Sequence, residues 1–486
     1  MLRVLSRRTS QLSKVRNFTK VSVSKFSNAS LLSQEVTSES PKVPSYSRPK
    51  IRLDSLSRIL VETIKTTGPL SLSSYMKTCL THTDYGYYTT KDPLGIRSSG
   101  DFVTSPEISQ MFGEMIGVWF FTVYLTQNKP NNVQFIEFGP GKGTLMHDLL
   151  KSFNQLLRSS TLKEKISIVM VEASPLLRLE QFELLCGKDN KIKESEDGIG
   201  YVGVTKWGNK IRWVDTEQDI EEIGHKDHSN YVVCHEFFDA LPIKQFEKTE
   251  QGWRECLVDY ILPEDRTTKE SEGRLTLPSQ TTIKSSDLEA EKEPSFHMTV
   301  SPKKTTSAFV PQQSPRHNAL PIGSRVEISP ETLTYSKKIH QIITSNEKQQ
   351  GAALYIDYGP ADTIPINTLR GIKDHAIVSP FVNPGTVDLS ADVDFQGIKV
   401  LSENLGGVDV HGPVEQGDWL NELGMQYRAE HLINKSKNDA DKERISKSYI
   451  RLVDKSDAGM GKIYKFMGIL PKGTTKPVGF GGSVSE

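Results

Sequence analysis

Residues 133–145 read Val-Gln-Phe-Ile-Glu-Phe-Gly-Pro-Gly-Lys-Gly-Thr-Leu, and this stretch indicates the fold. Its first six residues are mostly apolar, which predicts a buried β-strand that runs into a glycine-rich turn. A helix is expected to begin near Gly143 or Thr144. Because Gly139, Gly141 and Gly143 lack a Cβ atom, a ligand can lie against the main chain at the carboxyl end of the strand. The stretch therefore predicts a nucleoside-binding turn.

The spacing of the glycines distinguishes between two kinds of nucleoside. A dinucleotide-binding loop spaces them as GxGxxG, which would put the third glycine at position 144, where this chain has Thr. Glu137, two residues before the first glycine, can meet the positive amino group of a methionine moiety, and Pro140 lies within the same turn. The spacing favours S-adenosylmethionine over NAD. A purely structural glycine turn is the alternative.

The next apolar segment, residues 166–171, reads Ile-Ser-Ile-Val-Met-Val and predicts a second strand that is buried on both faces. It is followed by Glu172, and the 33 residues from Gly139 to Glu172 leave room for a strand, a helix and a strand. A carboxylate at the end of this strand can accept hydrogen bonds from both ribose hydroxyls of a nucleoside. An ordinary solvated acid in a turn is the alternative for Glu172.

Further strands are predicted at residues 211–214, 231–234 and 351–357, with residues 462–470 as a closing antiparallel strand. Strands that alternate with helical segments indicate a parallel sheet with helices on both faces. The expected fold class is α/β. In detail, we expect a class I S-adenosylmethionine methyltransferase with a Rossmann-like seven-stranded sheet, an N-terminal helical elaboration and inserted segments.

The strand at residues 231–234 runs directly into His235-Glu-Phe-Phe-Asp-Ala-Leu-Pro242. In a doubly wound sheet this loop opens at the same edge as the glycine turn. Methyl transfer needs positioning and electrostatics, and paired carboxylates can hold the fork of donors on a planar guanidinium. Glu236 and Asp239 are therefore the predicted catalytic pair, and His235 is a candidate for proton removal. Capping or loop-stabilising roles are the alternative for the two acids, and a structural role is the alternative for His235.

The N-terminus has the composition of a mitochondrial transit peptide. Residues 1–34 contain seven basic residues and no acidic residue, so a helix there can present one basic and one apolar face. No long hydrophobic core follows, which excludes a secretory signal. A disordered basic tail is the alternative. The mitochondrial matrix is the predicted location.

Composition also suggests how the chain is divided. The stretch at 263–320 is rich in Glu, Lys, Ser, Thr and Pro with few aromatic residues, so it is expected to bury too little surface to offset its ordering entropy. We expect a transit peptide at 1–32, a flexible tether at 33–50, an N-terminal helical region packing on the catalytic domain at 51–130, a first part of the methyltransferase domain at 131–262, a disordered insertion at 263–320, a second part with a substrate-side elaboration at 321–472, and a flexible tail at 473–486.

Charge and composition argue against several classes of function. No run of about 18 apolar residues occurs in the 486-residue chain, so no membrane span is expected. Beyond residues 1–34 there are 53 basic and 60 acidic residues, a net charge of −7 that argues against nucleic-acid binding. The four cysteines are scattered and no His cluster has ligand spacing, so no metal site is expected.

Several segments together resemble the family of mitochondrial complex I assembly protein-arginine methyltransferases, the MidA/DUF185 group. The resemblance runs from about residue 51 to residue 470 except for the insertion. Besides the glycine turn and the His235–Pro242 loop, it is carried by Asp84-Tyr-Gly-Tyr-Tyr88, Gly100-Asp-Phe-Val-Thr-Ser-Pro-Glu107, Tyr355-Ile-Asp-Tyr-Gly359, the Pro384–Phe395 stretch and Gly412-Pro-Val-Glu-Gln-Gly417.

This resemblance implies symmetric dimethylation of an arginine on a core iron–sulfur subunit of complex I, in the matrix, during assembly of that complex. It also implies that the glycine turn and Glu137 hold S-adenosyl-L-methionine. Residues that close over the cofactor from the N-terminal side would be Gly100, Thr104, Ser105, Pro106 and Glu107, and Asp357 and Tyr358 would line the substrate side. Bacterial members often have His where this chain has Asp392. The long insertion also departs from the family pattern.

Two other readings compete with a catalytic arginine methyltransferase. One is an assembly chaperone that binds S-adenosylmethionine and acts by holding its client protein. The other is a NAD-dependent oxidoreductase or a small-molecule methyltransferase. A homodimer is left open.

Overall fold

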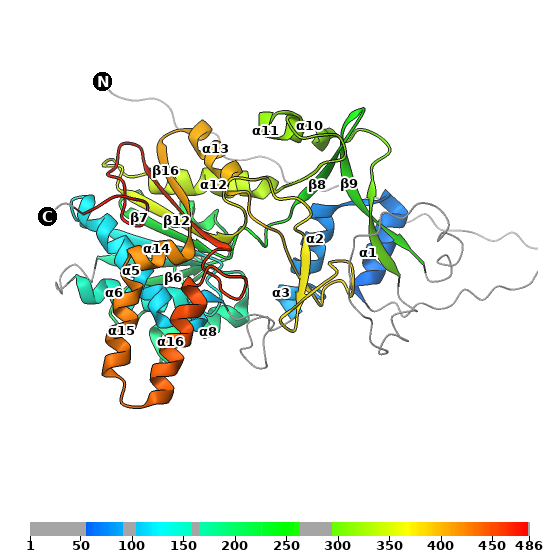
Figure 1. Cartoon of the computed structure of the whole chain (residues 1–486). Coiled ribbons are helices and arrows are strands. Elements are labelled where there is room, and N and C mark those ends of the chain that lie inside the picture. The colour runs from blue at the N-terminus through cyan, green and yellow to red at the C-terminus, as the bar shows by residue number, and fades with distance from the viewer. Residues whose placement is uncertain (1–54, 91–103, 158–164, 225, 263–293, 485–486) are drawn as a thin grey trace, which may run out of the picture. The chain divides into compact units, whose positions relative to one another are not determined.

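The computed structural model describes residues 55–90, 104–157, 165–224, 226–262 and 294–484, all within one compact unit, Ile51–Glu486 (Figure 1). The transit peptide and tether expected at residues 1–50 lie outside the described residues, and so does Gly100. In the described ranges, no helix combines the length and the apolar character that a membrane crossing requires.

A nine-stranded sheet forms the centre of the fold. Its five central strands are parallel, and β17 is antiparallel to both of its neighbours. In spatial order the strands are β16 (Val408–Glu415), β17 (Tyr464–Pro471), β12 (Gly351–Tyr358), β7 (Ser229–His235), β2 (Val133–Phe138), β3 (Ile166–Val171), β6 (Lys210–Val214), β5 (Tyr201–Val204) and β4 (Lys193–Glu194).

The sequence predicted the parallel strands correctly because each is a short, apolar run followed by a turn. Seven strands, β16 to β6 in the order above, form the expected sheet. The antiparallel pair β4–β5 adds two strands at the β6 edge, and the sequence analysis did not predict it. Both added strands are short and neither contains a buried residue, so neither shows the apolar pattern of a buried strand.

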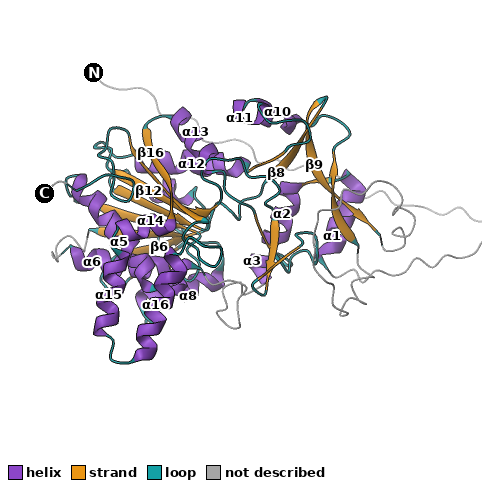
Figure 2. Ribbon diagram, in the orientation of Figure 1, coloured by secondary structure: helices purple, strands orange, loops and turns teal. Residues whose placement is uncertain are grey.

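Helices cover both faces of this sheet (Figure 2). Alternate residues of each strand point to opposite faces, so each strand packs against both helical layers. On β2, for example, Phe135 packs with one helical layer and Ile136 with the other. The first layer contains α5 (Gln110–Thr126), α6 (Thr144–Leu156), α8 (Pro175–Cys186), α14 (Gln416–Glu422), α15 (Met425–Lys435) and α16 (Asp439–Val453). The second contains α9 (Asp219–Ile223), α12 (Pro330–Ile343) and α13 (Phe395–Leu405).

The N-terminal helices divide between two cores. Helix α5 packs on the main sheet, as expected for residues 51–130. The earlier helices, α1 (Leu56–Thr67), α2 (Leu72–Thr81) and α3 (Tyr87–Thr90), instead share a core with a second sheet. That sheet consists of β1 (Leu70–Ser71), β8 (Lys244–Thr249), β9 (Gly252–Ile261), β10 (Ser295–Val300) and β11 (Arg325–Ile328). A small third sheet joins β13 (Arg370–Lys373), β14 (Ala376–Val378) and β15 (Asp388–Ser390).

The prediction of a disordered insertion at 263–320 is wrong for residues 294–320. Strand β10 pairs with β9 over six residues, from Ser295–Ile261 to Val300–Cys256. It is followed by η3 (Thr306–Ala308), α10 (Phe309–Gln312) and α11 (Pro315–Asn318). Phe296 and Ala308 are buried, and the backbone of β10 gains its hydrogen bonds from a neighbouring strand, which composition alone does not reveal. Residues 263–293 lie outside the described residues.

The prediction of a flexible tail at 473–486 is also wrong for residues 473–484. Phe480 is buried and its ring lies 6.2 Å from that of Trp119 on α5. The indole nitrogen of Trp119 donates a hydrogen bond to the Val478 carbonyl oxygen at 3.0 Å. The tail therefore completes the core between α5 and the main sheet.

This packing predicts that Phe480→Ala lowers the free energy of unfolding by about 3 kcal/mol, because the substitution leaves a cavity beside Trp119. Val484→Ala, at a partly exposed position in the same tail, serves as the matched control and should change stability by less than about 0.5 kcal/mol. Urea denaturation of both variants measures the difference. Equal stability of the two variants would show that the tail does not contribute to the core.

Candidate functional site

The glycine turn joins β2 to α6, which begins at Thr144 as predicted. Gly139 and Gly143 have φ values of 61° and 82°, a region that side-chain-bearing residues rarely adopt. A Cβ atom on Gly143 would lie 3.2 Å from Gln181 Cγ, and one on Gly139 would lie 3.2 Å from the ring of Phe237. Glycine is therefore required at both positions, by the backbone conformation and by the close packing of neighbouring side chains.

Gln181 fixes the turn, and the sequence analysis did not identify it. Its side-chain nitrogen donates hydrogen bonds to the Gly141 carbonyl oxygen at 2.6 Å and to Glu172 Oε2 at 3.2 Å. Its side-chain oxygen accepts a hydrogen bond from Trp213 Nε1 at 2.9 Å. Gln181 is fully buried on α8, and both polar atoms of its side chain have hydrogen-bond partners. A glutamine inside a helix gives no local signal of this role.

The two acids predicted to bind the cofactor lie near each other at the carboxyl ends of adjacent strands. Glu172 follows β3 and accepts a hydrogen bond from the Ser174 amide at 2.8 Å. Burial raises the pKa of Glu172 to about 7, against the hydrogen bonds that it accepts. Glu137, on β2, is buried, and its pKa is raised well above the usual value by desolvation and by the charge of Glu172. Glu172 therefore lies close enough to Glu137 for its charge to affect the pKa of Glu137.

The surroundings of Glu137 fit a cationic ligand. Its Oε2 atom is buried and has no hydrogen-bond partner among the described residues. A buried acceptor without a partner is costly, and the ammonium group of a methionine moiety would supply both a donor and an opposite charge. Glu137 would hold that group, and Glu172 would accept from the ribose hydroxyls. The Cβ-free turn between them would contact the rest of the nucleoside.

The segment at residues 104–108 contacts the same turn. Helix α4 (Ser105–Ile108) contains Glu107, whose carboxylate pairs with Lys142 of the glycine turn at 3.1 Å. Ser105 and Pro106 are buried, and the Ser105 hydroxyl has no hydrogen-bond partner among the described residues. Thr104 precedes the helix without capping it through its side chain. Three of the four described residues from this segment are thus placed against the turn or buried behind it.

Glu236 occupies a conformation that marks the loop after β7. Its φ of 49° lies in the left-handed region, which is uncommon for a residue with a side chain and typical of functional sites. Its Oε1 atom accepts a hydrogen bond from the Tyr464 hydroxyl at 2.9 Å. Burial, together with the charge of Asp239, raises the pKa of Glu236 to about 8.

Asp239, the second acid of this loop, is held by another tyrosine. The Tyr358 hydroxyl donates a hydrogen bond to Asp239 Oδ2, while Oδ1 is buried without a hydrogen-bond partner among the described residues. Tyr358 and Tyr464 face each other on paired strands, with their rings 5.6 Å apart in an edge-to-face arrangement. Two neighbouring tyrosines thus orient the two predicted catalytic acids.

Asp357 supports the backbone of the loop after β7. Its Oδ2 atom accepts hydrogen bonds from the backbone amides of Phe237, Phe238 and Asp239, at 3.2, 3.0 and 3.3 Å. Its Oδ1 atom accepts one from the Tyr358 amide at 3.0 Å. The side chain is buried and both oxygens contact the protein's own backbone. Asp357 therefore fixes the backbone of the loop after β7. Its predicted place on the substrate side stays a prediction.

His235 lies beside the acids as a neutral side chain. Burial lowers its pKa to about 3, and its ring packs edge-to-face on Phe112 at 5.3 Å. Its Nε2 atom is 3.6 Å from Glu236 Oε1, beyond ordinary hydrogen-bond length. The position supports the structural alternative for His235 more than a role in proton removal.

Comparison with known proteins identifies the family. The family model described as "Putative S-adenosyl-L-methionine-dependent methyltransferase" matches residues 115–414, more than half of the chain. The chain belongs to this family. S-adenosyl-L-methionine is accordingly its cofactor, and the matched region includes both the glycine turn and the acidic loop.

Relatives with assigned names match over most of their length. The chain is 34% identical to "Protein arginine methyltransferase NDUFAF7, mitochondrial" of Bos taurus, over 85% of this chain and 83% of that protein. It is 33% identical to the Homo sapiens protein of the same name, over 85% and 83%. The chain is thus a member of the family that contains these mitochondrial proteins, as the resemblance of its motifs had indicated.

Solved structures confirm the fold class. A Burkholderia thailandensis protein crystallised with S-adenosyl-homocysteine superposes with a TM-score of 0.62 at 22% identity, covering 87% of this chain and 93% of that chain. A native structure from the same organism gives 0.61 with the same coverage. At this identity the likeness concerns the fold alone.

The site can support methyl transfer to a cationic acceptor. S-adenosyl-L-methionine supplies an electrophilic methyl group on a positively charged sulfur. Around the place where it would lie, the chain supplies the acids Glu137 and Glu236, whose carboxylates can stabilise positive charge. No group of three or more potential ligands in the described part of the chain is arranged to hold a metal ion.

The raised pKa of Glu172 makes a prediction about stability. The folded state binds this proton more tightly than the unfolded state, so the stabilisation is fully present below about pH 4.5 and is lost as the pH rises through about 7. Glu172→Gln is neutral at every pH and should remove up to about 3 kcal/mol of the decline between pH 5 and 8. Urea denaturation of the ligand-free protein at several pH values measures it. A decline equally steep in the variant would contradict the assignment.

Proposed function

We propose that this protein is a protein-arginine N-methyltransferase of the mitochondrial matrix that forms symmetric dimethylarginine on a core iron–sulfur subunit of complex I, as a step in assembly of that complex. The names of its relatives support arginine as the acceptor and mitochondria as the location. The degree of methylation, the protein substrate and the role in assembly extend from the family resemblance.

The observation that carries the proposal is the pair of acids on the loop after β7. Asp239 is buried, Glu236 is partly buried with 18% of its side chain exposed, and each accepts a hydrogen bond from a tyrosine. The charge of Asp239 raises the pKa of Glu236. A guanidinium that enters this site satisfies both acids with its fork of donors and neutralises them. The acids would thus bind the substrate arginine and align one of its nitrogens.

The transfer itself requires the arginine to lose one proton. A bond forms between the guanidinium nitrogen and the methyl carbon while the bond from that carbon to sulfur breaks, which leaves S-adenosylhomocysteine. The surplus proton on the nitrogen passes to the Asp239 carboxylate and from there to solvent. The buried setting strengthens each of these charge interactions relative to water.

We expect Glu236→Gln and Asp239→Asn each to reduce methyl transfer by at least about 100-fold, because each removes charge from the guanidinium site while retaining side-chain size. The assay measures transfer of a radiolabelled methyl group from S-adenosyl-L-methionine to matrix proteins, followed by mass spectrometry of the modified arginine. Glu255→Gln is the matched control, since Glu255 is a buried acid of the second sheet that pairs with Lys244 at 2.9 Å.

The same variants distinguish an enzyme from an assembly chaperone that binds the cofactor. Both variants should retain cofactor binding by calorimetry, because Glu137, Glu172 and the glycine turn are unchanged. Cells that carry them should then lack assembled complex I. Normal assembly without detectable arginine methylation would favour the chaperone, and full activity of both variants would refute the proposed catalytic pair.

The proposed location makes a separate prediction. Residues 1–32 fused to a fluorescent protein should direct it to mitochondria, because their basic and acid-free composition suits import. Replacing the seven basic residues with Gln should leave the fusion in the cytosol. Fluorescence microscopy with a matrix marker checks both fusions. Identical distribution of the two would contradict a transit peptide.

A further inference from the structure

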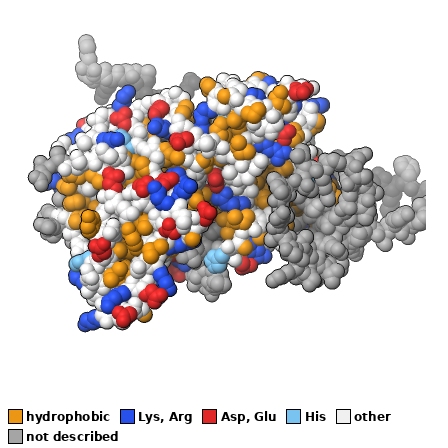
Figure 3. Space-filling view, viewed as in Figure 1, with side chains coloured by type: hydrophobic (Ala, Val, Ile, Leu, Met, Phe, Trp, Pro, Cys, Tyr) orange, Lys and Arg blue, Asp and Glu red, His pale blue; other side chains and the backbone are white. Residues whose placement is uncertain are grey.

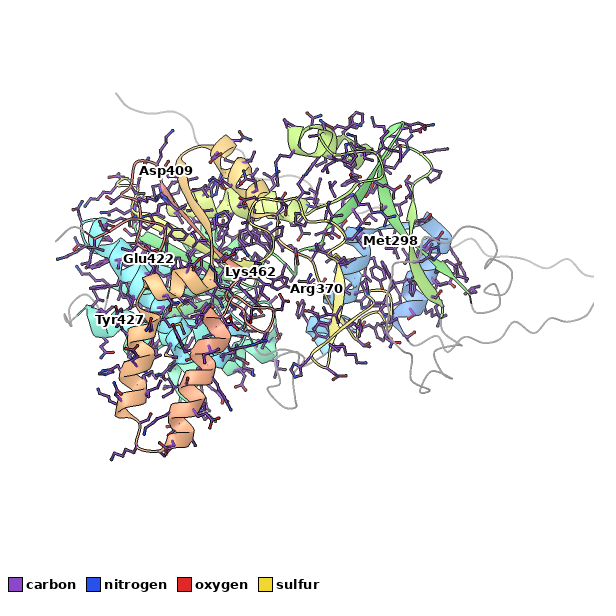
Figure 4. The ribbon with its side chains drawn as sticks, viewed as in Figure 1. Met298, Arg370, Asp409, Glu422, Tyr427 and Lys462 are labelled. Carbon is purple, nitrogen blue, oxygen red and sulfur yellow. The ribbon has the colours of Figure 1, made fainter. Side chains whose placement is uncertain are left out.

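Arg370 brings a positive charge to the acidic site from a separate sheet. It is the first residue of β13 and is labelled in Figure 4. Its guanidinium lies over the ring of Tyr358, 4.7 Å from the centroid. Its Nη1 atom donates hydrogen bonds to Asp392 Oδ1 at 2.8 Å and to the Thr368 carbonyl oxygen at 2.9 Å. These contacts hold the positive charge against the ring of Tyr358.

Asp239 is the acid that this arrangement affects. Tyr358 connects the two, since its ring contacts Arg370 and its hydroxyl donates to Asp239. The pKa of Asp239 is raised by burial, while the hydrogen bond from Tyr358 and the charge of Arg370 lower it. Charged or titratable groups that also act within this cluster come from several elements: Glu236 on the same loop, Asp357 on β12, Asp388 on β15, Tyr88 on α3 and Tyr464 on β17.

Glu236 receives no comparable support. Its hydrogen bond from Tyr464 favours the charged form, but no basic side chain contributes to lowering its pKa. The charges of Asp239, Glu107 and Asp388 raise that pKa further, to about 8. The two acids of the loop are therefore unequal, although the sequence presents them as a pair three residues apart.

We propose that Arg370 is a positioning residue that, through Tyr358, holds Asp239 as an oriented, charged acceptor for the substrate nitrogen. Glu236 then binds the other side of the guanidinium and can also take up a proton. This inference rests on the proposed function, because it assigns different roles to the two acids of the proposed catalytic pair. Arg370 itself does not touch the reacting atoms in this arrangement.

Asp392 positions Arg370 and so belongs to the same chain of contacts, which leads through Tyr358 to Asp239. Its amide donates a hydrogen bond to the Thr368 hydroxyl at 2.8 Å, and its carboxylate pairs with the guanidinium. Arg370 therefore has one carboxylate on its outer side and, beyond the Tyr358 ring, a second on its inner side. Removing Arg370 would leave Tyr358 without its stacking partner and Asp239 without a nearby positive charge.

The test compares Arg370→Met with the unchanged protein in steady-state methylation of an arginine-containing substrate from pH 6 to 9. Without Arg370, the pKa of Asp239 rises, so activity that needs the carboxylate requires a higher pH. The acid limb of the kcat profile should move up by about one unit. At pH 7, kcat should fall about 10-fold with little change in KM for the cofactor. Tyr358→Phe should shift the limb in the same direction.

A matched control uses a second arginine of similar exposure. Arg325→Met removes the partner of Glu247 in the second sheet, at 2.9 Å, and should leave the pH profile unchanged. Cofactor binding by calorimetry confirms that each variant is folded. An unshifted acid limb in folded Arg370→Met, with Asp239→Asn inactive, would overturn the role of Arg370 alone. Full activity of Asp239→Asn would instead overturn the proposed function.

Discussion

The Asp357 carboxylate organises the acidic site. It accepts hydrogen bonds from three consecutive backbone amides of the loop after β7. These bonds hold the loop at the end of the parallel sheet. Amides that would otherwise be buried without partners are satisfied, and the Glu236 backbone is held in its left-handed conformation. The side chains of Glu236 and Asp239 consequently lie beneath the hydroxyls of Tyr464 and Tyr358. The positions of both acids therefore depend on a residue that belongs to the neighbouring strand.

The local parts of the fold were predictable from sequence, whereas the parts made by distant segments were not. The glycine turn, Glu172 and the apolar strands can each be predicted from a few neighbouring residues, because the turn and the burial of a strand are local properties. Gln181, Tyr464 and Arg370 reach the site from helix α8 and two other strands, and nothing in their own segments indicates this. The error at residues 294–320 has the same origin, since β10 is stabilised by its pairing with β9 rather than by its own composition.

The concentration of acids explains why the site is poised for a cation. Glu137, Glu172, Glu236 and Asp239 all have raised pKa values because burial disfavours their charged forms. On the face drawn in Figure 3, by contrast, Lys and Arg side chains are interspersed with Asp and Glu. The site thus differs from that face in desolvation as much as in charge, and a bound cation would favour the charged forms of these acids.

The order of strands in the main sheet has a consequence for biogenesis. Strand β17 is the last strand in the chain, yet it inserts between β12 and β16, which precede it. Until residues 464–471 have been synthesised, one hydrogen-bonding edge of β12 is unpaired and Tyr464 is not yet beside Glu236. A chain that lacks β17 would therefore expose a β12 edge on which other chains can pair, and its acidic site would be incomplete.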